Sequence, residues 1–303
     1  MLDLYTDATP NGLKVSICLE ELGLQYKVHH LFLAGDQMTP EFTKLNPNNK
    51  IPVLVDDGFV LTESGAILIY LAEKTGKLLP KEPKLRARLI EMIMFQMASF
   101  GPMFGQLLVF AGAWKNEYPA VTGRYVKEVN RILAVLEARL QGQAYFVGDE
   151  FTVADIAMLP WFRVAATHPI GQMLSVSGKP NLNAWWERVS ARPAVVKGLS
   201  IPEPFPAEKQ FEGFIKATIG LGDLKRCRIE TRSITWEASL YPANCFHDYS
   251  QTTSMAWRFP FPTQRRGHMF NFDASQDVLS ATCISSRSLR GKMRSPMPAY
   301  ERS

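Results

Sequence analysis

Residues 46–68, with the sequence NPNNKIPVLVDDGFVLTESGAIL, decide the fold of this chain. IPVLVDD and FVLT have the apolar, β-branched composition of strands, and the Asp57-Gly58 pair between them is a strong hairpin signal. A helix is predicted to begin near Ser64, in ESGAILIYLAEKTG. The stretch therefore predicts a β-β-α unit with a proline at the entrance of its first strand and a helix N-terminus after its second.

The residues before this stretch predict a β-α-β unit. LDLYT and YKVHHLFL are typical of strands, and TPEFTKL predicts a short helical turn that Pro47 stops. Between the two strands, an apolar helical stripe precedes Gly23 and consists of Val15, Ile17, Cys18, Leu19 and Leu22. Residues 1–77 are thus predicted to fold in the order β-α-β, then β-β-α.

Strand signals disappear after residues 78–84, LLPKEPK, which are predicted to be a linker. Residues 85–208 predict an all-helical domain whose first helix, over about 85–112, should kink at Gly101-Pro102. A second helix is expected over about 121–140, and a fourth in PNLNAWWERVSARP. The third should open at FTVADIA, where Thr152 and Asp155 have capping-box spacing and Phe151 and Ile156 have that of a hydrophobic staple.

Residues 209–303 differ in composition from the rest of the 303-residue chain. Their apolar residues have no period, and serine, arginine, proline and aromatic residues are scattered among them. We therefore predict a poorly ordered tail. The excess of lysine and arginine behind the net charge of +5 lies wholly in this segment, so the basicity does not predict nucleic-acid binding by the folded part.

The cysteine pattern and the apolar runs indicate the cellular compartment in which the protein is expected. The four cysteines, Cys18, Cys227, Cys245 and Cys283, have no CxxC spacing, which argues against a disulfide scaffold or a metal site and favours the cytoplasm. The N-terminus has no signal-peptide pattern, and no run of about 18 purely apolar residues occurs. The sequence therefore predicts no membrane partner.

Five motifs together resemble the glutathione transferases: TPNG after the first strand, NPNNKIPVL, ESGAIL, GPMFGQ and FTVADIA. Over about residues 1–205 the chain looks most like the bacterial nu-class disulfide-bond oxidoreductases and their fungal prion-like relatives. The resemblance implies a thioredoxin-like domain followed by an all-helical domain, and a homodimer. It also implies glutathione as co-substrate, a role in detoxification, and no metal.

The resemblance implies that Pro52 and the helix N-terminus at Ser64 both bind glutathione. A cis peptide costs only about 0.5–1 kcal/mol before proline, and a cis Ile51-Pro52 bond would turn the Ile51 backbone outward to pair with glutathione as with an added strand. The helix N-terminus at Ser64 suits the γ-glutamyl carboxylate. Glu63 would accept from the γ-glutamyl amine. The simpler interpretation is a strand-entry proline and a plain N-cap at Ser64.

Three more residues are carried over from the family pattern. Lys50 and Gln37 would hold the glycyl end of glutathione, and Arg124 would reach its carboxylates; the alternative for Arg124 is an exposed helix charge.

The glutathione sulfur is expected at the start of the first helix, in the loop TDATPNG. Nu-like members place a threonine and an asparagine there, which implies that Thr9 and Asn11 donate hydrogen bonds to the thiolate. The simpler interpretations are an N-cap for Asn11 and a turn residue for Thr9. Tyr5 is expected in the core, and Cys18, on the apolar stripe, is expected to be a buried hydrophobe.

The expected site contains no protein thiol, so the resemblance implies that glutathione supplies both thiols of a disulfide reduction. Conjugation and peroxide reduction by the same thiolate are alternatives, and so is a non-catalytic glutathione-binding regulator. Phe110 and Trp114 are expected to line an apolar acceptor site. Leu107 and Leu108 replace polar residues of relatives and favour an apolar acceptor.

Overall fold

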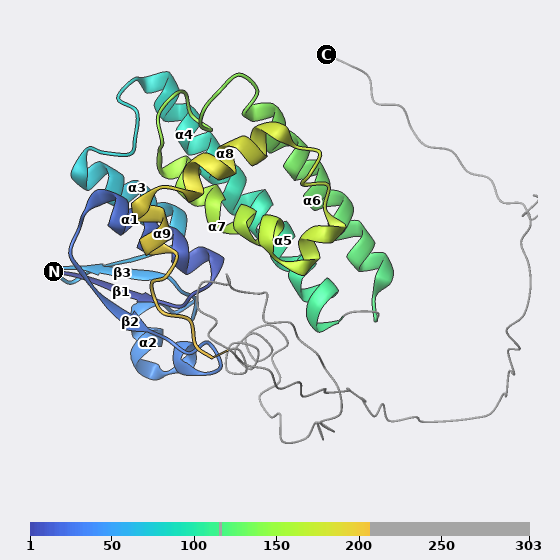
Figure 1. Ribbon diagram of the computed structural model, residues 1–303. Helices are drawn as coiled ribbons and strands as arrows, with labels where there is room; N and C mark the ends of the chain where they lie inside the picture. The colour runs from blue at the N-terminus through green and yellow to red at the C-terminus, as the bar shows by residue number, and fades with distance from the viewer. Residues whose placement is uncertain (115–116, 207–303) are drawn as a thin grey trace, which may run out of the picture. The chain divides into compact units, whose positions relative to one another are not determined.

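The structure of the protein, a computed structural model, describes residues 1–114 and 117–206. Its first part is a four-stranded mixed sheet with helices on both faces (Figure 1). The elements are, in order, β1 (Leu2–Thr6), α1 (Pro10–Leu22), β2 (Tyr26–His30), the 3₁₀ helix η1 (Asp36–Met38), α2 (Pro40–Leu45), β3 (Val53–Asp56), β4 (Phe59–Thr62) and α3 (Ser64–Thr75). This order confirms the predicted β-α-β then β-β-α arrangement.

The sheet order is β2-β1-β3-β4, with β1 parallel to β2 and the other pairs antiparallel. One face of β1 is buried through Leu2, Leu4 and Thr6. Tyr5 lies on the other face, half-buried, where its ring stacks on His29 at 4.2 Å and contacts Phe42 of α2 at 6.3 Å. The prediction that Tyr5 is a core residue is therefore wrong, because strand alternation turns it away from the buried face.

The hairpin turn forms where the sequence predicts it. Asp57 and Gly58, with φ of 47° and 90°, connect β3 to β4. Positive φ at both central residues is the geometry that favours Asp-Gly, because it matches the twist of the flanking strands. The turn directs the chain from β4 into α3.

Helices form the second part of the described chain. They are α4 (Pro83–Phe95), the π-helical η2 (Gln96–Phe100), α5 (Gly101–Leu108), the π-helical η3 (Val109–Ala113), α6 (Pro119–Arg139), α7 (Val153–Thr167), the 3₁₀ helix η4 (Pro169–Met173), α8 (Pro180–Ser190) and α9 (Pro193–Gly198). The all-helical class is confirmed, although α4 begins at Pro83 rather than at residue 85. The predicted tail, residues 209–303, lies outside the described residues.

The expected kink at Gly101-Pro102 takes the form of a π-helical turn. Pro102 has no N–H to donate to the preceding turn, and the wider η2 turn lies directly before it. Helical geometry continues through Gly101, whose φ and ψ are −60° and −56°. The helix is therefore widened here rather than broken.

Among the described residues, one helical run, Pro83–Gly112, is long and apolar enough to cross a membrane. The prediction concerned unbroken apolar runs, and charged residues such as Arg86, Arg88 and Glu91 interrupt this one. Ile93, Phe100 and Phe104 of this run are fully buried in the core. Core helices pass the same test, so the run is weak evidence for a membrane segment.

Helix α7 lies at the centre of the helical part and contacts α1. The predicted capping box is present at its start: Thr152 Oγ1 accepts from Ala154 N at 3.2 Å, and Asp155 Oδ2 accepts from Thr152 N at 2.9 Å. Phe151 and Ile156, the predicted staple residues, are both buried. The capped helix thereby presents Trp161 to the N-terminal end of α1.

Helix α9 is docked directly on α1. A Cβ atom at Gly198 would lie 2.5 Å from the Ile17 Cα atom, so only glycine fits this contact. Ser16 Oγ donates to the Gly198 carbonyl at 2.8 Å, and Arg192 pairs with Glu21 at 2.7 Å through two nitrogens. These contacts fix α1 between the sheet and the helices.

Candidate functional site

The loop between β1 and α1 places Thr9 at the N-cap of the helix. Its Oγ1 accepts from Gly12 N at 3.3 Å, and α1 begins at Pro10. The simpler interpretations, an N-cap at Asn11 and a plain turn residue at Thr9, are therefore wrong, since Thr9 is the cap and Asn11 lies in the first turn. A Cβ atom at Gly12 would lie 2.2 Å from the Asp7 carbonyl oxygen, so glycine is needed for this close turn.

Hydrogen bonds of Asp7 hold the same loop against β2. Its Oδ1 accepts from Ala8 N at 2.7 Å and pairs with His30 Nε2 of β2 at 3.0 Å. Burial raises the pKa of the Asp7 carboxyl, and the hydrogen bond with His30 opposes that shift. The Asp7 carbonyl also accepts from Thr9 N at 2.7 Å. The backbone around Thr9 is thus held before any ligand binds.

The Asn11 side chain has a defined orientation. Its Oδ1 accepts from Lys14 Nζ at 2.9 Å and from Trp161 Nε1 of α7 at 3.1 Å. Reversing the amide would turn its NH₂ group against these two donors. Among the described contacts Nδ2 has no acceptor, so its protons remain available to a ligand.

Lys14 is fully buried beneath this site, and sequence reasoning missed it. Besides Asn11, its Nζ donates to Gln96 Oε1 at 2.7 Å and to Ser64 Oγ at 3.4 Å. Burial lowers its pKa to about 7, and the nearby charge of Glu63 opposes that shift. The available signal was a lysine three residues after Asn11, inside a helix whose neighbouring positions are apolar.

The segment that decides the fold places Ser64 against Lys14. The Ile51-Pro52 bond is cis, as expected. Glu63 is the N-cap of α3, is exposed and has φ of 69° without a side-chain capping bond. The simpler interpretation of Ser64 as N-cap is therefore wrong. Ser64 is the first residue of α3, it is 5% exposed, and its Oγ lies 3.7 Å from Met97 Sδ.

Gln37 and Lys50 are in different environments. Gln37, in η1, is buried; its Nε2 donates to the Leu33 carbonyl at 2.6 Å, and its Oε1 has no partner. Lys50 is exposed, and its carbonyl accepts from Asn46 Nδ2 at 2.7 Å. This bond anchors the loop before Pro52. No described contact joins Gln37 or the Lys50 side chain to Asn11 or Ser64.

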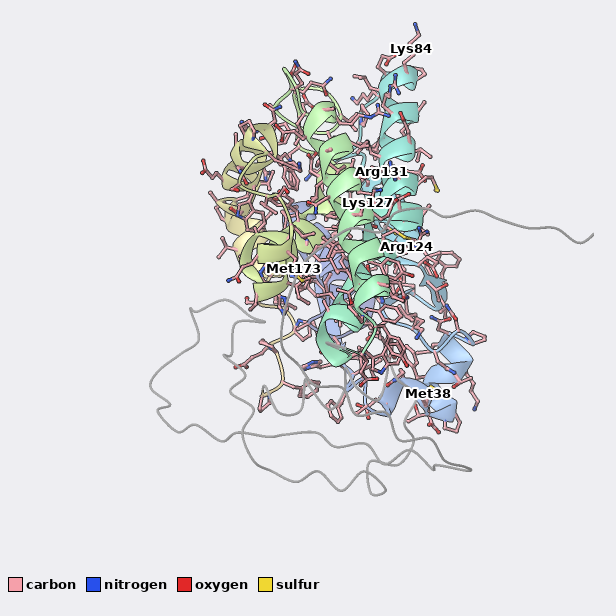
Figure 2. All side chains as sticks on the ribbon, turned by 90° about the vertical axis from the view of Figure 1, so that its right-hand side faces the viewer. Met38, Lys84, Arg124, Lys127, Arg131 and Met173 are labelled. Carbon is pink, nitrogen blue, oxygen red and sulfur yellow. The ribbon has the colours of Figure 1, made fainter. Side chains whose placement is uncertain are left out.

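Arg124 lies on α6, exposed, in a row with Lys127 and Arg131 (Figure 2). The charge of Arg124 acts on Glu128 of the same helix. The pKa of Glu128 is lowered chiefly by the hydrogen bond from Arg131, and the charge of Arg124 lowers it further. No described contact brings Arg124 to Ser64 or Glu63.

Phe110 and Trp114 are half-buried and form an aromatic cluster with two tyrosines. Ring centroids are 5.1 Å apart between Phe110 and Trp114, and Phe110 stacks on Tyr125 at 5.7 Å. Tyr118 contacts both Phe110 and Trp114. No described contact joins this cluster to Thr9 or Asn11. Leu107 is fully buried and Leu108 is half-buried, and their effect on the acceptor site stays a prediction.

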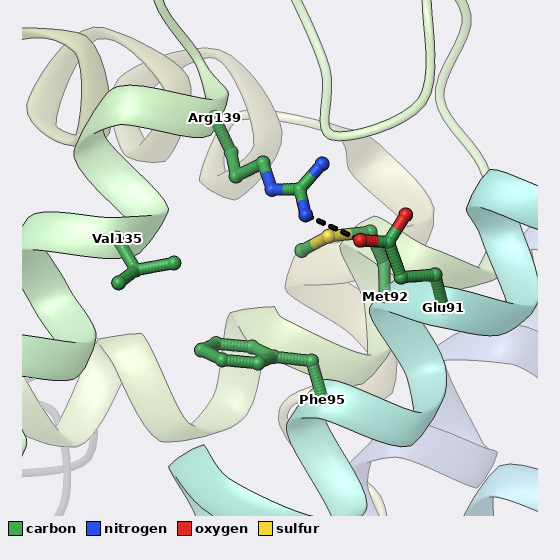
Figure 3. A pocket seen from close by; sticks show the side chains of 5 residues that line it. All are labelled: Glu91, Met92, Phe95, Val135 and Arg139. Atoms are coloured by element: carbon green, nitrogen blue, oxygen red, sulfur yellow. Dashed lines mark hydrogen bonds and ion pairs between the residues drawn. The ribbon is translucent and has the colours of Figure 1, made fainter.

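A cavity of about 60 Å³ lies between α4 and α6 (Figure 3). Glu91 and Arg139 form an ion pair at its edge, and Met92, Phe95 and Val135 complete its lining. Within residues 1–114 and 117–206, no group of three or more histidine, cysteine or acidic side chains could hold a metal ion.

Cys18 is the one cysteine within the described part of the chain. It is fully buried in the core, as predicted, and burial raises the pKa of its thiol. A protonated, inaccessible thiol is a poor nucleophile.

Both parts of the described chain match domains of one known family. Residues 8–74 match the glutathione S-transferase N-terminal domain, and residues 100–193 match the glutathione S-transferase C-terminal domain. The disulfide-bond oxidoreductase YfcG of Escherichia coli is 39% identical over 207 residues, covering 66% of this chain and 94% of that protein.

Two solved structures are also similar. A glutathione transferase from Burkholderia graminis, with two glutathione molecules bound per subunit, is 47% identical with a TM-score of 0.63, covering 67% of this chain and 88% of that one. One from Pseudomonas putida, with one glutathione disulfide bound per subunit, is 40% identical with a TM-score of 0.64, covering 66% and 91%. With both family domains matched in order, the chain belongs to the glutathione S-transferase family.

Proposed function

We propose that this chain is a glutathione-dependent disulfide reductase. The observation that carries the proposal is the orientation of Asn11, whose oxygen is held by two donors while its NH₂ protons have no described acceptor. A thiolate at the start of α1 would accept from these protons and would lie near the positive end of the helix dipole. The Escherichia coli relative, named as a disulfide-bond oxidoreductase, supports the same activity.

In the proposed reaction, the thiolate of bound glutathione attacks one sulfur of a substrate disulfide. The S–S bond breaks, a mixed disulfide with glutathione forms, and the released thiolate takes a proton from solvent. A second glutathione thiolate then attacks the glutathione sulfur of the mixed disulfide, which gives oxidised glutathione and the second substrate thiol. The chain contributes donors at Thr9 and Asn11 and supplies no thiol of its own.

Ser64 and Glu63 would hold the γ-glutamyl end of glutathione in this proposal. The hydroxyl of Ser64 and the first N–H groups of α3 are donors suited to its carboxylate, and the exposed carboxylate of Glu63 suits its amine. The backbone of Ile51 would pair with the cysteinyl unit. Lys50, Gln37 and Arg124 remain proposals for the carboxylate ends.

The function is tested by the reduction of hydroxyethyl disulfide, coupled to glutathione reductase and NADPH. We expect NADPH oxidation that requires both this protein and glutathione. Binding of glutathione without turnover would instead favour the alternative of a non-catalytic glutathione-binding regulator.

The half-buried aromatic cluster favours conjugation as a second candidate, because it would suit an apolar electrophile. Phe110 and Trp114 are its members predicted to line the acceptor site. Conjugation of glutathione to chlorodinitrobenzene measures this activity directly. A conjugation rate above the rate of disulfide reduction would make transfer to carbon the main reaction.

Replacing Ser64 with alanine is expected to weaken glutathione binding by about 10- to 100-fold, because one hydrogen bond to a charged group contributes about 1.5–3 kcal/mol. Isothermal titration calorimetry measures the dissociation constant. Ser200→Ala, which changes an exposed serine after α9, is the matched control and should bind as the parent does. An unchanged dissociation constant for Ser64→Ala would remove Ser64 from the binding site.

We also propose that the enzyme is a homodimer. Phe59 on β4 and Met94 on α4 are both 53% exposed, and an interface between the sheet part of one subunit and the helical part of the other would cover such residues. Light scattering measures the mass in solution. A mass equal to one chain at micromolar concentration would contradict the proposal.

A further inference from the structure

The ammonium group of Lys14 has three oxygen acceptors from three elements, and Met97 Sδ lies at 3.9 Å. Asn11 Oδ1 on α1 lies at 2.9 Å, Gln96 Oε1 at the start of η2 at 2.7 Å, and Ser64 Oγ at the start of α3 at 3.4 Å. An ammonium carries three N–H donors and no acceptor. Each of its protons therefore has one oxygen to bind.

These contacts determine the hydrogen-bond direction at Asn11. Lys14 and Trp161 both donate to Oδ1, so the amide oxygen is occupied by protein donors. Without the Lys14 donor, one of the two bonds that hold the amide is lost. The orientation of the NH₂ group then depends on Trp161 alone.

The Lys14 ammonium also determines the direction of the hydrogen bond that the Ser64 hydroxyl can donate. Its hydroxyl oxygen accepts from Lys14, so the hydroxyl proton is directed elsewhere. In the structure that proton has only the Met97 sulfur, at 3.7 Å, and a thioether is a weak acceptor. A carboxylate placed at the N-terminus of α3 would be a much stronger acceptor.

We propose that Lys14 is a positioning residue that makes both Asn11 and Ser64 donors toward glutathione. The proposal rests on the proposed function and adds to it, because neither the expected sulfur site nor the expected carboxylate site includes this residue. One buried cation then orients both ends of the ligand-binding surface. Its positive charge also favours a bound thiolate over a bound thiol.

The charges around Lys14 are few. Glu63, the N-cap of α3, is the ionisable group whose charge acts on it. Lys14 contacts Ser64 of α3 and Gln96 and Met97 of η2. Its partner Asn11 contacts Trp161 of α7. None of these four residues is ionisable. Arg192 and Lys197 pair with Glu21 and Glu20 at the other end of α1. Burial leaves the pKa of Lys14 near 7, so an anionic ligand would favour its ammonium form.

Lys14→Met, which keeps an unbranched side chain one atom shorter and removes its donors, tests the proposal. The ultraviolet absorbance of the thiolate, followed as a function of pH with glutathione bound, gives the midpoint of thiol ionisation. We expect the midpoint to rise by about one pH unit relative to the parent, equivalent to a tenfold smaller thiolate fraction. Lys127→Met on the exposed face of α6 is the matched control, and its midpoint should equal that of the parent.

Circular dichroism reports whether each variant is folded, and Lys14→Gln, which keeps a neutral donor group, is the second variant. Its midpoint should lie between those of the parent and Lys14→Met. A folded Lys14→Met or Lys14→Gln with the midpoint and affinity of the parent would overturn the inference and leave the proposed function intact. A parent that binds glutathione without lowering the midpoint would overturn the proposed function itself.

Discussion

Replacing Asn11 with alanine is expected to lower the rate of disulfide reduction by about 100-fold. The substitution removes a hydrogen-bond donor that is already oriented toward the expected position of the thiolate. Removing one such preorganised donor typically lowers the rate by about 10²- to 10³-fold. Trp161 and Lys14 would each lose their Asn11 acceptor as well. The measurement is kcat/KM for hydroxyethyl disulfide with glutathione saturating.

Asn183→Ala is the control for this change. Asn183 lies on α8 and also donates one amide hydrogen bond, to the Val176 carbonyl at 3.1 Å, at a position with no described contact to Asn11. Its kcat/KM should match that of the parent. An Asn11→Ala variant as active as the parent would show that Asn11 does not act on the sulfur.

Asp155→Asn is expected to lower the free energy of unfolding by about 3 kcal/mol. Asp155 is fully buried, and its two oxygens accept four hydrogen bonds. The donors are Phe146 N, Trp185 Nε1, Thr152 N and Thr152 Oγ1. An asparagine would present NH₂ to at least one N–H donor, and leaving a buried donor unpaired costs about 1–3 kcal/mol.

Urea denaturation followed by tryptophan fluorescence measures this loss. Asp149→Asn, an exposed position in the preceding loop, makes the same chemical change without the burial and should leave stability unchanged. A parent-like midpoint in urea for Asp155→Asn would contradict the account of the α7 cap.

The stability difference between the parent and Asp155→Asn is also expected to depend on pH. Burial raises the pKa of Asp155 from 3.8 to about 6, so the folded protein holds this proton more tightly than the unfolded chain does. The stabilisation is fully present below pH 3.8 and is lost as the pH rises through about 6. The difference in unfolding free energy between the parent and Asp155→Asn should therefore shrink over this range. A difference that grows would contradict the sign of the shift.

The sequence predicted the elements that rest on local patterns. The Asp57-Gly58 turn, the Gly23 end of α1 and the Thr152–Asp155 cap each depend on residues within one turn of each other. Strand alternation and helical periods likewise gave the order of β and α elements. Helix starts were less accurate, since α4 begins at Pro83 and the N-caps are Thr9 and Glu63 rather than Asn11 and Ser64.

The contacts that build the site were not predictable in the same way. Lys14 meets Ser64, Gln96 and, through Asn11, Trp161, which lie far apart in sequence and come together only through packing of α1 against α3, η2 and α7. The burial of Leu107 and the choice of which face of β1 is buried also depend on tertiary packing. Composition cannot say which side of a helix or strand the rest of the chain covers.

The central claim is that both reacting thiols come from glutathione. The most direct measurement is disulfide reduction by a variant in which all four cysteines are replaced, as Cys18→Ala, Cys227→Ser, Cys245→Ser and Cys283→Ser. The account predicts a rate of hydroxyethyl disulfide reduction within about twofold of the parent, with complete dependence on added glutathione. If the folded variant still binds glutathione but reduces the disulfide no faster than a sample without enzyme, a thiol of the protein carries the reaction.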